Sequence, residues 1–259
     1  MRAGDATAYH TGHIPGAVPF STHAVESGPL WNRRCDTELE EALAAHGIAQ
    51  HSTVVLYSRD TTAAARVAAL LLYAGVDGVH VLDGGLKAWL AAGYPVETLP
   101  RQAIPVQSFG RMYPNHHPYV IDAEEAHAVL ADEGAALVSI RSWSEYIGAT
   151  SGYAYIQPKG RIAGDVWGYA GSVPRCMNHY RNVDNTMRSY HEIAANWRLQ
   201  GIKPDKRVAF YCGTGWRASE AFFYAYLMGW RQIAVYDGGW LEWSQRSTYP
   251  VATGEPPWP

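Results

Sequence analysis

The sequence has few cysteines, little net charge and no apolar run long enough to span a membrane. Its three cysteines, Cys35, Cys176 and Cys212, are odd in number and irregularly spaced, which argues against a disulfide framework. The formal net charge of −3 at pH 7 gives no reason to expect nucleic acid or a membrane surface as a partner. The longest apolar stretch, residues 63–76, contains Arg66 and therefore predicts a buried helix.

Histidine is present without the spacing of a metal site. His116 and His117 are adjacent but have no neighbouring cluster of ligands, so we expect a solvated loop and no bound metal. The composition is that of an ordinary globular protein, with 47% hydrophobic and 17% charged residues. At 259 residues the chain can form one large domain or two of ordinary size.

An internal repeat decides between one domain and two. Residues 54–85 align without a gap with residues 208–239, and both stretches end in Asp-Gly-Gly. Upstream, the segment HIPGAV at 13–18 matches RIAGDV at 161–166. A repeat of this length indicates two copies of one domain and not a solenoid.

Each copy alternates short β-rich runs with helical patterns. In the second copy, Asp122 with Glu125 and Ser189 with Glu192 have the spacing of capping boxes that start helices. We expect a further helix at 218–228 and strands at 136–141, 207–211 and 233–237. Strands alternating with helices predict an α/β fold, a mainly parallel sheet with helices on both faces.

The repeat also predicts the domain boundaries. The first domain spans residues 1–100, the proline-rich segment 101–118 is the linker, and the second domain spans 119–259. The first copy lacks a counterpart of the strand at 136–141 and of the helix before it. Either the chain is a fragment, or another segment fills that place.

The loop after the strand at 207–211 carries the chemistry. It reads Cys212, Gly213, Thr214, Gly215, Trp216, Arg217, and a helix follows. Glycines allow a tight curl around the sulfur, and N–H groups at a helix N-terminus favour an anion. An arginine adds a full charge. Such a setting lowers the pKa of a thiol and makes it a nucleophile.

A structural role is the alternative for any single cysteine, because cysteine is often a small buried apolar residue. The first copy has Ser58 at the aligned position and Ala63 where the second has Arg217. One copy therefore has the thiol, the glycines and the arginine together, and the other has none of them. A catalytic role for Cys212 explains why the three occur together. Cys35 and Cys176 lack such surroundings and are interpreted as structural.

The second copy resembles a rhodanese domain, and the chain resembles a tandem rhodanese sulfurtransferase. The loop CGTGWR, the GRIAG and HIPGAV segments and the strand–helix–strand ending in YDGGW carry the resemblance, which covers residues 3 to 252. It implies two rhodanese-like domains, the first inactive and the second catalytic. Cys212 would carry the sulfur, and Gly213 to Arg217 would hold the substrate anion and the persulfide.

The resemblance also implies a reaction. Cys212 takes the outer sulfur of thiosulfate or 3-mercaptopyruvate, and cyanide or a thiol then accepts it from the persulfide. No cofactor is needed, because sulfur itself is the transferred group. The partners would be the small-molecule donor and acceptor, and a thiol protein is a further candidate acceptor.

The sequence departs from the family pattern in the early strand. Ser139 stands where the family usually has an aspartate, two residues before Arg141, a candidate donor-binding residue. Tandem members commonly have a second arginine where this chain has Glu145, and Arg161 replaces the usual histidine. Arg161 either compensates or forms a surface salt bridge. The loop sequence does not decide between thiosulfate and 3-mercaptopyruvate as the sulfur donor.

Two other functions would use a similar cysteine loop. Cysteine phosphatases have five residues between cysteine and arginine, and here only four separate Cys212 from Arg217, which makes the ring too tight for a tetrahedral phosphate. A persulfide carrier serving one partner protein would use the same loop. The inserted segment 151–160 is expected over the mouth of the site or on the other domain. A cytoplasmic location is favoured, or a periplasmic one if a leader peptide precedes this chain.

Overall fold

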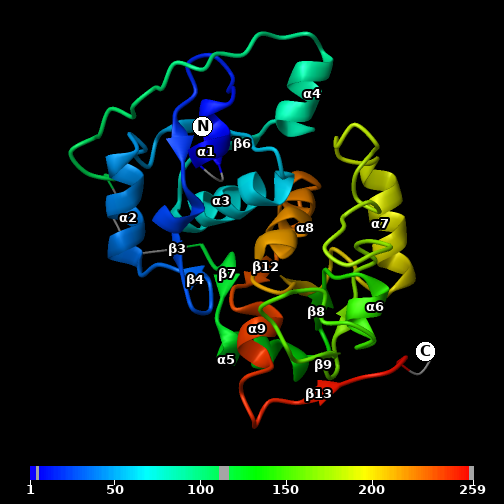
Figure 1. Ribbon diagram of the computed structural model, residues 1–259. Helices are drawn as coiled ribbons and strands as arrows, with labels where there is room; N and C mark the ends of the chain where they lie inside the picture. Colours follow the sequence, from blue (N-terminus) through cyan, green and yellow to red (C-terminus); the bar gives the residue numbers. More distant parts are fainter. Residues whose placement is uncertain (4–5, 111–116, 257–259) are drawn as a thin grey trace. The chain divides into compact units, whose positions relative to one another are not determined.

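A computed structural model describes residues 1–3, 6–110 and 117–256, and its chain forms two compact units (Figure 1). The first unit comprises residues 1–120 with the short segment 184–186, and the second comprises residues 121–183 and 187–259. Within the described residues, none of the helices has the length and apolar character that crossing a membrane would require.

The first unit is built mostly from short elements. In chain order they are β1 (Arg2–Ala3), α1 (Ala6–His10), β2 (Pro19–Phe20), the 3-10 helix η1 (Thr22–Ala24), β3 (Glu26–Ser27), β4 (Asn32–Arg33), α2 (Asp36–Ala45), β5 (Thr53–Leu56), α3 (Thr61–Ala74), β6 (Gly78–Val81) and α4 (Gly85–Ala91). Strand β1 pairs in parallel with β2, and β5 with β6. A parallel bridge between Arg2 and Tyr57 joins the two pairs.

The start of the first unit matches the end of a strand in the second. The N–H of Ala3 donates to the carbonyl of Tyr57, and the N–H of Ile140 donates to the carbonyl of Tyr211. Tyr57 and Tyr211 are aligned in the repeat. Residues 2–3 of the first unit therefore take the place beside Tyr57 that the end of the strand predicted at 136–141 takes beside Tyr211.

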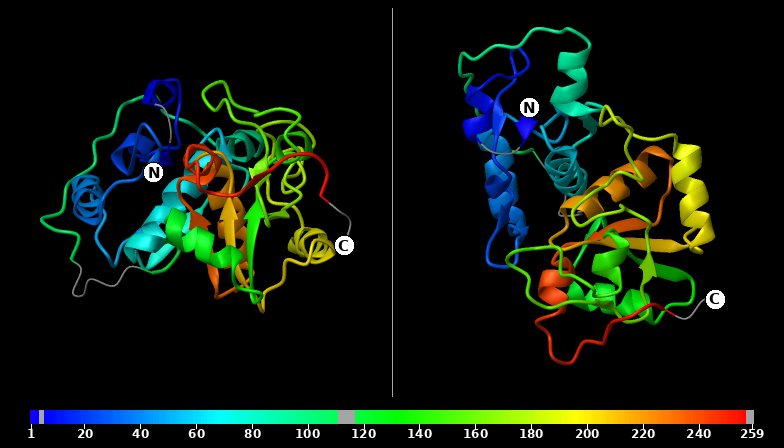
Figure 2. Two further views of the ribbon diagram at one scale, coloured as in Figure 1. Left: turned by 90° about the horizontal axis from the view of Figure 1, so that it is seen from below. Right: turned by 45° about the vertical axis from the view of Figure 1, so that its right-hand side comes forward.

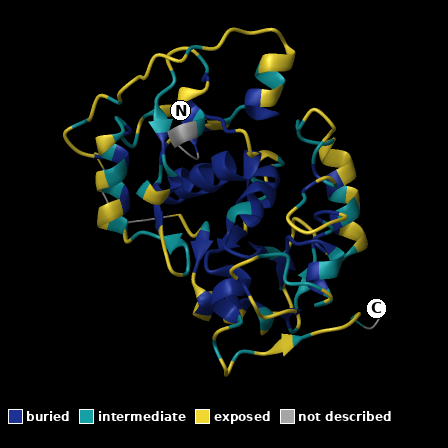
Figure 3. Ribbon diagram, viewed as in Figure 1, coloured by how far each residue is buried: buried dark blue, intermediate teal, exposed yellow. Residues whose placement is uncertain are grey.

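Helix α3 is the buried helix that the apolar stretch predicts. All fourteen of its residues are buried (Figure 3). Asp60 caps its N-terminus by accepting from the N–H of Thr62, and Gly75 ends it with a φ of 88°. Arg66 is accommodated because its guanidinium pairs with the buried carboxylate of Glu26 at 2.9 Å.

The second unit contains the larger sheet, whose strands lie side by side in Figure 2. Its elements are β7 (Val120–Ile121), α5 (Ala123–Leu130), β8 (Ala135–Ser139), α6 (Trp143–Tyr146), β9 (Arg161–Ile162), β10 (Val166–Trp167), α7 (Tyr190–Leu199), β11 (Arg207–Tyr211), α8 (Trp216–Leu227), β12 (Ile233–Tyr236), α9 (Gly239–Trp243) and β13 (Val251–Ala252). The strand order is β10-β8-β11-β12-β7. Strand β11 pairs in parallel with both β8 and β12.

Helices cover this sheet as the α/β prediction requires. Helix α8 packs on β11 and β12, and α5 packs on β8. Figure 1 shows α8 above the sheet and α5 with α9 below it. Strand β11 is central, so all but its first residue are buried, and its carboxyl end opens directly into the loop that begins at Cys212.

One of the two predicted capping boxes is present. Asp122 and Glu125 cap α5 reciprocally, which confirms that prediction. The prediction of a capping box at Ser189 and Glu192 is wrong. Helix α7 does start after Ser189, but the Ser189 side chain makes no capping hydrogen bond. Its backbone, at φ −48° and ψ 125°, departs from the usual geometry of a cap residue.

The segment predicted as the linker packs against the first unit where it is described. The N–H of Gln50 donates to the carbonyl of Phe109, and the N–H of Val106 donates to that of Ala44. Phe109 is buried. Within the predicted histidine loop, His116 lies outside the described residues and His117 is exposed.

Candidate functional site

Cys212 lies at the carboxyl end of β11, where ligands usually bind in parallel sheets. Its side chain is buried, at 1% exposure. The turn from strand to helix is completed in four residues, Cys212 to Gly215, and α8 begins at Trp216, two residues earlier than predicted. Gly215 makes this possible, because its φ of 84° is a left-handed conformation that glycine adopts at little cost.

The carbonyls of the loop are held by the next helix. The N–H of Trp240 donates to the carbonyl of Cys212 at 2.8 Å, and the N–H of Leu241 donates to that of Gly213 at 3.0 Å. Gly239 permits this approach, since a Cβ there would lie 2.7 Å from the carbonyl oxygen of Cys212. The carbonyls are thus engaged by α9, and the N–H groups of the first turn of α8 face the loop.

Arg217 stands in the first turn of α8 and forms a buried ion pair with Glu145. The two atom pairs are Nη1 to Oε2 at 3.0 Å and Nη2 to Oε1 at 2.8 Å. The side chains are 5% and 0% exposed, respectively. The charge that the sequence offers to a substrate is therefore paired inside the protein.

Glu145 is fixed from several sides. The N–H and the hydroxyl of Ser142 donate to Oε2 at 2.9 and 2.8 Å, and the N–H of Glu145 donates back to Oγ of Ser142 at 3.3 Å, which completes the capping box of α6. The N–H of Arg175 donates to the same oxygen at 3.4 Å. Gly152 passes so close that a Cβ on it would lie 2.3 Å from Oε1. The carboxylate is therefore fully hydrogen-bonded and held in one position.

Tyr153, from the inserted segment 151–160, lies on the loop. Its hydroxyl accepts from the N–H of Gly213 at 3.0 Å and also from Nη2 of Arg217. Its ring approaches Gly213 so closely that a Cβ there would lie 2.3 Å from Cζ. The segment thus covers the loop of its own unit, one of the two placements expected from the sequence.

The charges of the three side chains follow from these contacts. Burial raises the pKa of Tyr153 and outweighs the opposing effect of the Arg217 charge, so this phenol stays protonated. Burial opposes ionisation of Glu145, but the bonds from Arg217 outweigh it and hold the pKa of Glu145 below its ordinary value. Burial likewise opposes the charge of Arg217, but Tyr153 and Glu145 raise its pKa well above the usual range.

Arg141 takes a structural position in the described arrangement. It is fully buried and donates to the carbonyl of Gly160 at 2.9 Å and to the hydroxyl of Tyr211 at 3.3 Å. Its guanidinium also lies over the ring of Trp240, 5.1 Å from the centroid. Arg141 thus joins the strand end to the segment before β9.

Arg161 forms an ion pair that lies inside the protein. The side chain is nearly buried, donates to the carbonyl of Gly254 at 2.6 Å and lies 3.8 Å from the carboxylate of Asp165. A role in place of the arginine that position 145 lacks stays a prediction. The expected salt bridge is present, with Asp165, but it is enclosed and not at the surface. The antiparallel pairing of β9 with β13 explains this, because it encloses Arg161 beside the C-terminal strand.

The remaining candidates have simple surroundings. Thr214 is buried, and Trp216 is partly exposed at the start of α8. All three cysteines are free thiols; Cys35 is exposed, and Cys176 donates to Oδ1 of Asn178 at 3.1 Å. Among the described residues there is no group of three or more His, Cys, Asp or Glu side chains that could hold a metal ion.

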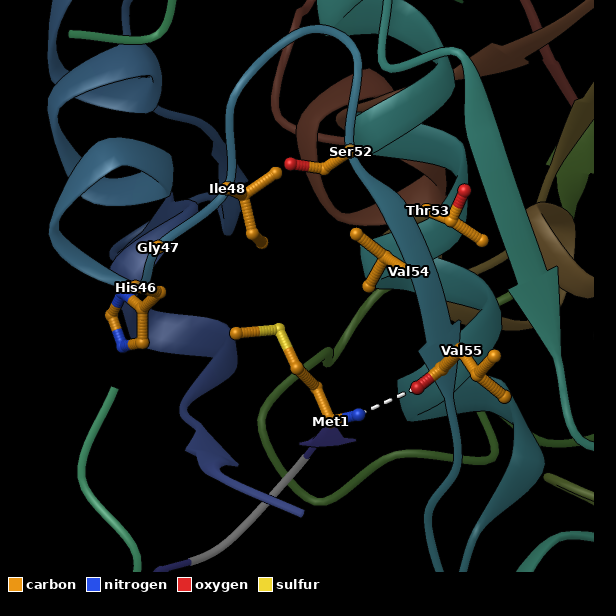
Figure 4. Close-up of a pocket in the computed structure, with 8 residues that line it drawn as sticks. All are labelled: Met1, His46, Gly47, Ile48, Ser52, Thr53, Val54 and Val55. Atoms are coloured by element: carbon orange, nitrogen blue, oxygen red, sulfur yellow. Dashed lines mark hydrogen bonds between the residues drawn. The ribbon is translucent and has the colours of Figure 1, made fainter. Parts of the chain in front are cut away.

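The first unit has a pocket of about 260 Å³ with a different character (Figure 4). Its lining combines Met1 with residues 46–48 and 52–55, a mixture of aliphatic side chains, two hydroxyl side chains and one histidine. Neither a thiol nor a guanidinium is among these eight residues. The pocket is therefore not a second copy of the Cys212 site.

The equivalent loop of the first unit is closed by its own side chains. The hydroxyl of Ser58 donates to the carbonyl of Asp60 and accepts from the N–H of Ala64. The carboxylate of Asp60 accepts from the N–H of Thr62 at 3.1 Å. A carboxylate thus occupies the helix N-terminus that in the second unit faces Cys212.

Two residues of the site were missed as functional residues by sequence reasoning. Glu145 was noted only as a departure from the family pattern, and Tyr153 only as part of an insertion. Their signals were present: a carboxylate at a position where the family resemblance implies a cation, and a tyrosine in an insertion absent from the other copy. Neither signal indicates which residue of the Cys212 loop is contacted by Glu145 or by Tyr153.

Comparison with known proteins identifies the domains. The sequence profile of the Rhodanese-like domain matches residues 2–92 and 122–246. The thiosulfate sulfurtransferase YnjE of Escherichia coli K12 is 53% identical over 95% of this chain, which spans 57% of that relative. A putative thiosulfate sulfurtransferase of Haloferax volcanii is 30% identical over 96% of this chain and 86% of its own. The sulfur carrier protein TtuD of Thermus thermophilus is 30% identical over 97% of this chain and 89% of its own.

Solved structures give the same assignment. The crystal structure of YnjE superposes with a TM-score of 0.93 at 51% identity, covering 98% of this chain and 62% of that one. The anaerobic ergothioneine biosynthesis enzyme of Chlorobium limicola, in complex with its natural substrate trimethyl histidine, gives 0.94 at 44% identity, covering 98% and 64%. The chain thus spans less than two thirds of both of these solved chains.

Proposed function

Because the chain belongs to the rhodanese family through two copies of its domain, we propose that it is a sulfurtransferase that carries a sulfane sulfur on Cys212. The donor is thiosulfate or 3-mercaptopyruvate, and the acceptor is cyanide or a thiol. The observation that carries the proposal is the position of Cys212 between the end of β11 and the first turn of α8. The names of relatives that match most of the chain support it.

The proposed reaction has two balanced steps. The thiolate of Cys212 attacks the outer sulfur of thiosulfate, the S–S bond of the donor breaks, and sulfite leaves with the bonding electron pair. With 3-mercaptopyruvate the C–S bond breaks, and pyruvate leaves after its carbon takes a proton. The acceptor then attacks the outer sulfur of the persulfide and regenerates the thiolate.

The loop residues have defined tasks in this scheme. N–H groups of Gly213 and of the first turn of α8 stabilise the persulfide anion, and each charge-assisted hydrogen bond contributes about 1.5–3 kcal/mol. Tyr153 must leave Gly213 before the outer sulfur can occupy that position. The phenol is neutral, so its departure separates no charge. Arg141 stabilises the carboxyl end of β11 through its hydrogen bond to the hydroxyl of Tyr211.

A relay of sulfur to one partner protein is the second candidate. The named sulfur carrier among the relatives favours it. It uses the same first step and differs only in the acceptor. Slow turnover with cyanide together with fast transfer to one protein thiol would distinguish it. Trimethyl histidine, the substrate named for a solved relative, belongs in the same acceptor panel.

Intact mass spectrometry tests the proposal. We expect incubation with thiosulfate or 3-mercaptopyruvate to add one sulfur atom, and cyanide to remove it. Cys212→Ser should gain nothing, and Cys176→Ser, a matched control at a partly exposed thiol, should gain the sulfur as the wild type does. An equal gain in Cys212→Ser would refute the assignment.

A further inference from the structure

The positive charge beside Cys212 is cancelled before any substrate arrives. Arg217 and Glu145 form two parallel hydrogen bonds, and both side chains are almost fully enclosed. A bidentate guanidinium–carboxylate pair of this kind has a net charge of zero and little tendency to open. An anionic donor would therefore meet an ion pair and not a free guanidinium.

The carboxylate cannot turn away to release the arginine. Ser142 holds Oε2 through its N–H and hydroxyl, and the backbone of Gly152 closes the other side of Oε1. Rotation of Glu145 would break the capping box of α6 and leave buried donors without acceptors. The neutralised state is therefore built into the packing.

The hydroxyl of Tyr153 satisfies donors that an anion would otherwise use. It accepts from the N–H of Gly213 and from Arg217, and it brings no charge. A donor that replaces it gains these hydrogen bonds but gains no net positive charge, because Glu145 remains in place. Each additional negative charge on the donor is then repelled by Glu145 about as strongly as it is attracted by Arg217.

We propose that Glu145 determines donor specificity by neutralising Arg217, so that the site accepts singly charged sulfur donors in preference to the thiosulfate dianion. This inference rests on the proposed function of Cys212. Thiosulfonates and mercapto acids are the donor classes that fit. With an alkanethiosulfonate, the Cys212 thiolate attacks the terminal sulfur, the S–S bond breaks, and the sulfinate leaves with the electron pair.

Two donors of similar shape separate charge from size. Thiosulfate carries two negative charges, and methanethiosulfonate replaces one charged oxygen by a methyl group. Single-turnover persulfide formation is measured by intact mass with each donor, and the ratio of the two rate constants is compared among variants. We expect Glu145→Gln to raise the thiosulfate-to-methanethiosulfonate ratio about tenfold or more, because glutamine keeps the capping hydrogen bonds and frees the charge of Arg217.

Two further variants control this measurement. Glu220→Gln removes the carboxylate of another enclosed ion pair, with Arg181, and should leave the ratio unchanged. The double variant Glu145→Gln/Arg217→Gln has no charge to unmask and should keep a ratio near that of the wild type. It leaves no unpaired buried charge, so it remains informative if the single variant does not fold.

The outcomes distinguish the two proposals. If neither donor adds sulfur to Cys212 of the wild type, the proposed function fails. If both donors react but Glu145→Gln leaves the ratio within about twofold of the wild type, the specificity inference fails and the function stands. A selective loss of the thiosulfate reaction in the double variant would also overturn the inference, because it would mean that Arg217 already acts on the dianion.

Discussion

The hydroxyl of Tyr153 accepts a hydrogen bond from the N–H of Gly213, the residue directly after Cys212, at 3.0 Å. The two residues come from an irregular insertion and from a strand–helix turn, and their contact closes the loop over the sulfur. The side chain of Cys212 is only 1% exposed. The reactivity of the thiol therefore depends on a side chain that belongs to neither the strand nor the helix.

Removing this cover should expose the thiol. We expect Tyr153→Ala to accelerate alkylation of Cys212 by iodoacetamide roughly tenfold or more, because modification no longer requires the segment to open first. Peptide mass spectrometry measures the rate at Cys212 separately from Cys35 and Cys176. Tyr190→Ala, at an exposed tyrosine on α7, is the control and should not change the rate. An unchanged rate in Tyr153→Ala would contradict the covering role.

Gly213 and Gly239 should respond differently to alanine. A Cβ on Gly213 meets only the flexible ring of Tyr153, whereas a Cβ on Gly239 meets the carbonyls of Cys212 and Gly213 within 2.8 Å. Gly213→Ala should slow persulfide formation by about a hundredfold, because the new Cβ displaces the loop by up to about 1 Å from its reactive position. Its stability should fall by no more than about 1–3 kcal/mol.

A double variant tests the cause of that loss. Tyr153→Ala should largely restore persulfide formation to Gly213→Ala, since it removes the atoms that the new Cβ meets. It should not rescue Gly239→Ala, whose clash is with backbone and whose φ of 54° is strained for alanine. Equal rescue of both would show that Tyr153 is not the specific obstacle at Gly213.

The buried carboxyl of Asp165 should make the free energy of unfolding fall as the pH rises. Burial raises its pKa to about 7, although the hydrogen bond from Tyr211 partly opposes this. The folded protein therefore keeps a proton that the unfolded chain loses near pH 4. This contribution to stability is fully present below about pH 4 and is lost as the pH rises to about 7, at up to about 1.4 kcal/mol per pH unit.

The measurement is the free energy of unfolding in urea between pH 5 and 8, followed by tryptophan fluorescence. Asp165→Asn mimics the protonated carboxyl and should flatten the decline seen in the wild type. Asp205→Asn, at an exposed aspartate, should leave the decline as it is. Parallel curves for the wild type and Asp165→Asn would exclude the raised pKa.

Much of this fold could be predicted because its signals are local or repeated. The strand at 207–211, the buried helix after Asp60 and the cap of α5 follow from periodicity and from side chains three residues apart. The two-copy organisation follows from self-similarity, and the family profile confirms it. The loop around Cys212 combines both kinds of signal.

The contacts of the site are not local and could not be predicted in that way. Glu145 is 72 residues from Arg217, and Tyr153 is 60 residues from Gly213. The segment that brings them together has no helical or strand period from which a position could be inferred. Only the three-dimensional structure shows that Glu145 neutralises Arg217 and that Tyr153 accepts the hydrogen bond from the N–H of Gly213.

The first copy should remain inactive even when it is given a thiol. Ser58 aligns with Cys212, but the carboxylate of Asp60 caps the N-terminus of α3 by accepting from the N–H of Thr62. A persulfide anion at position 58 would face this carboxylate, and the repulsion would destabilise it. We expect Ser58→Cys to gain no sulfur there while Cys212 of the same molecule is fully converted.

Peptide mass spectrometry after donor treatment measures both positions at once, and the matched variant Ser58→Cys/Asp60→Gly should show partial conversion. Full conversion at position 58 with Asp60 intact would mean that a helix N-terminus alone is enough, and that the closed loop of the first copy does not prevent a thiol there from taking up sulfur.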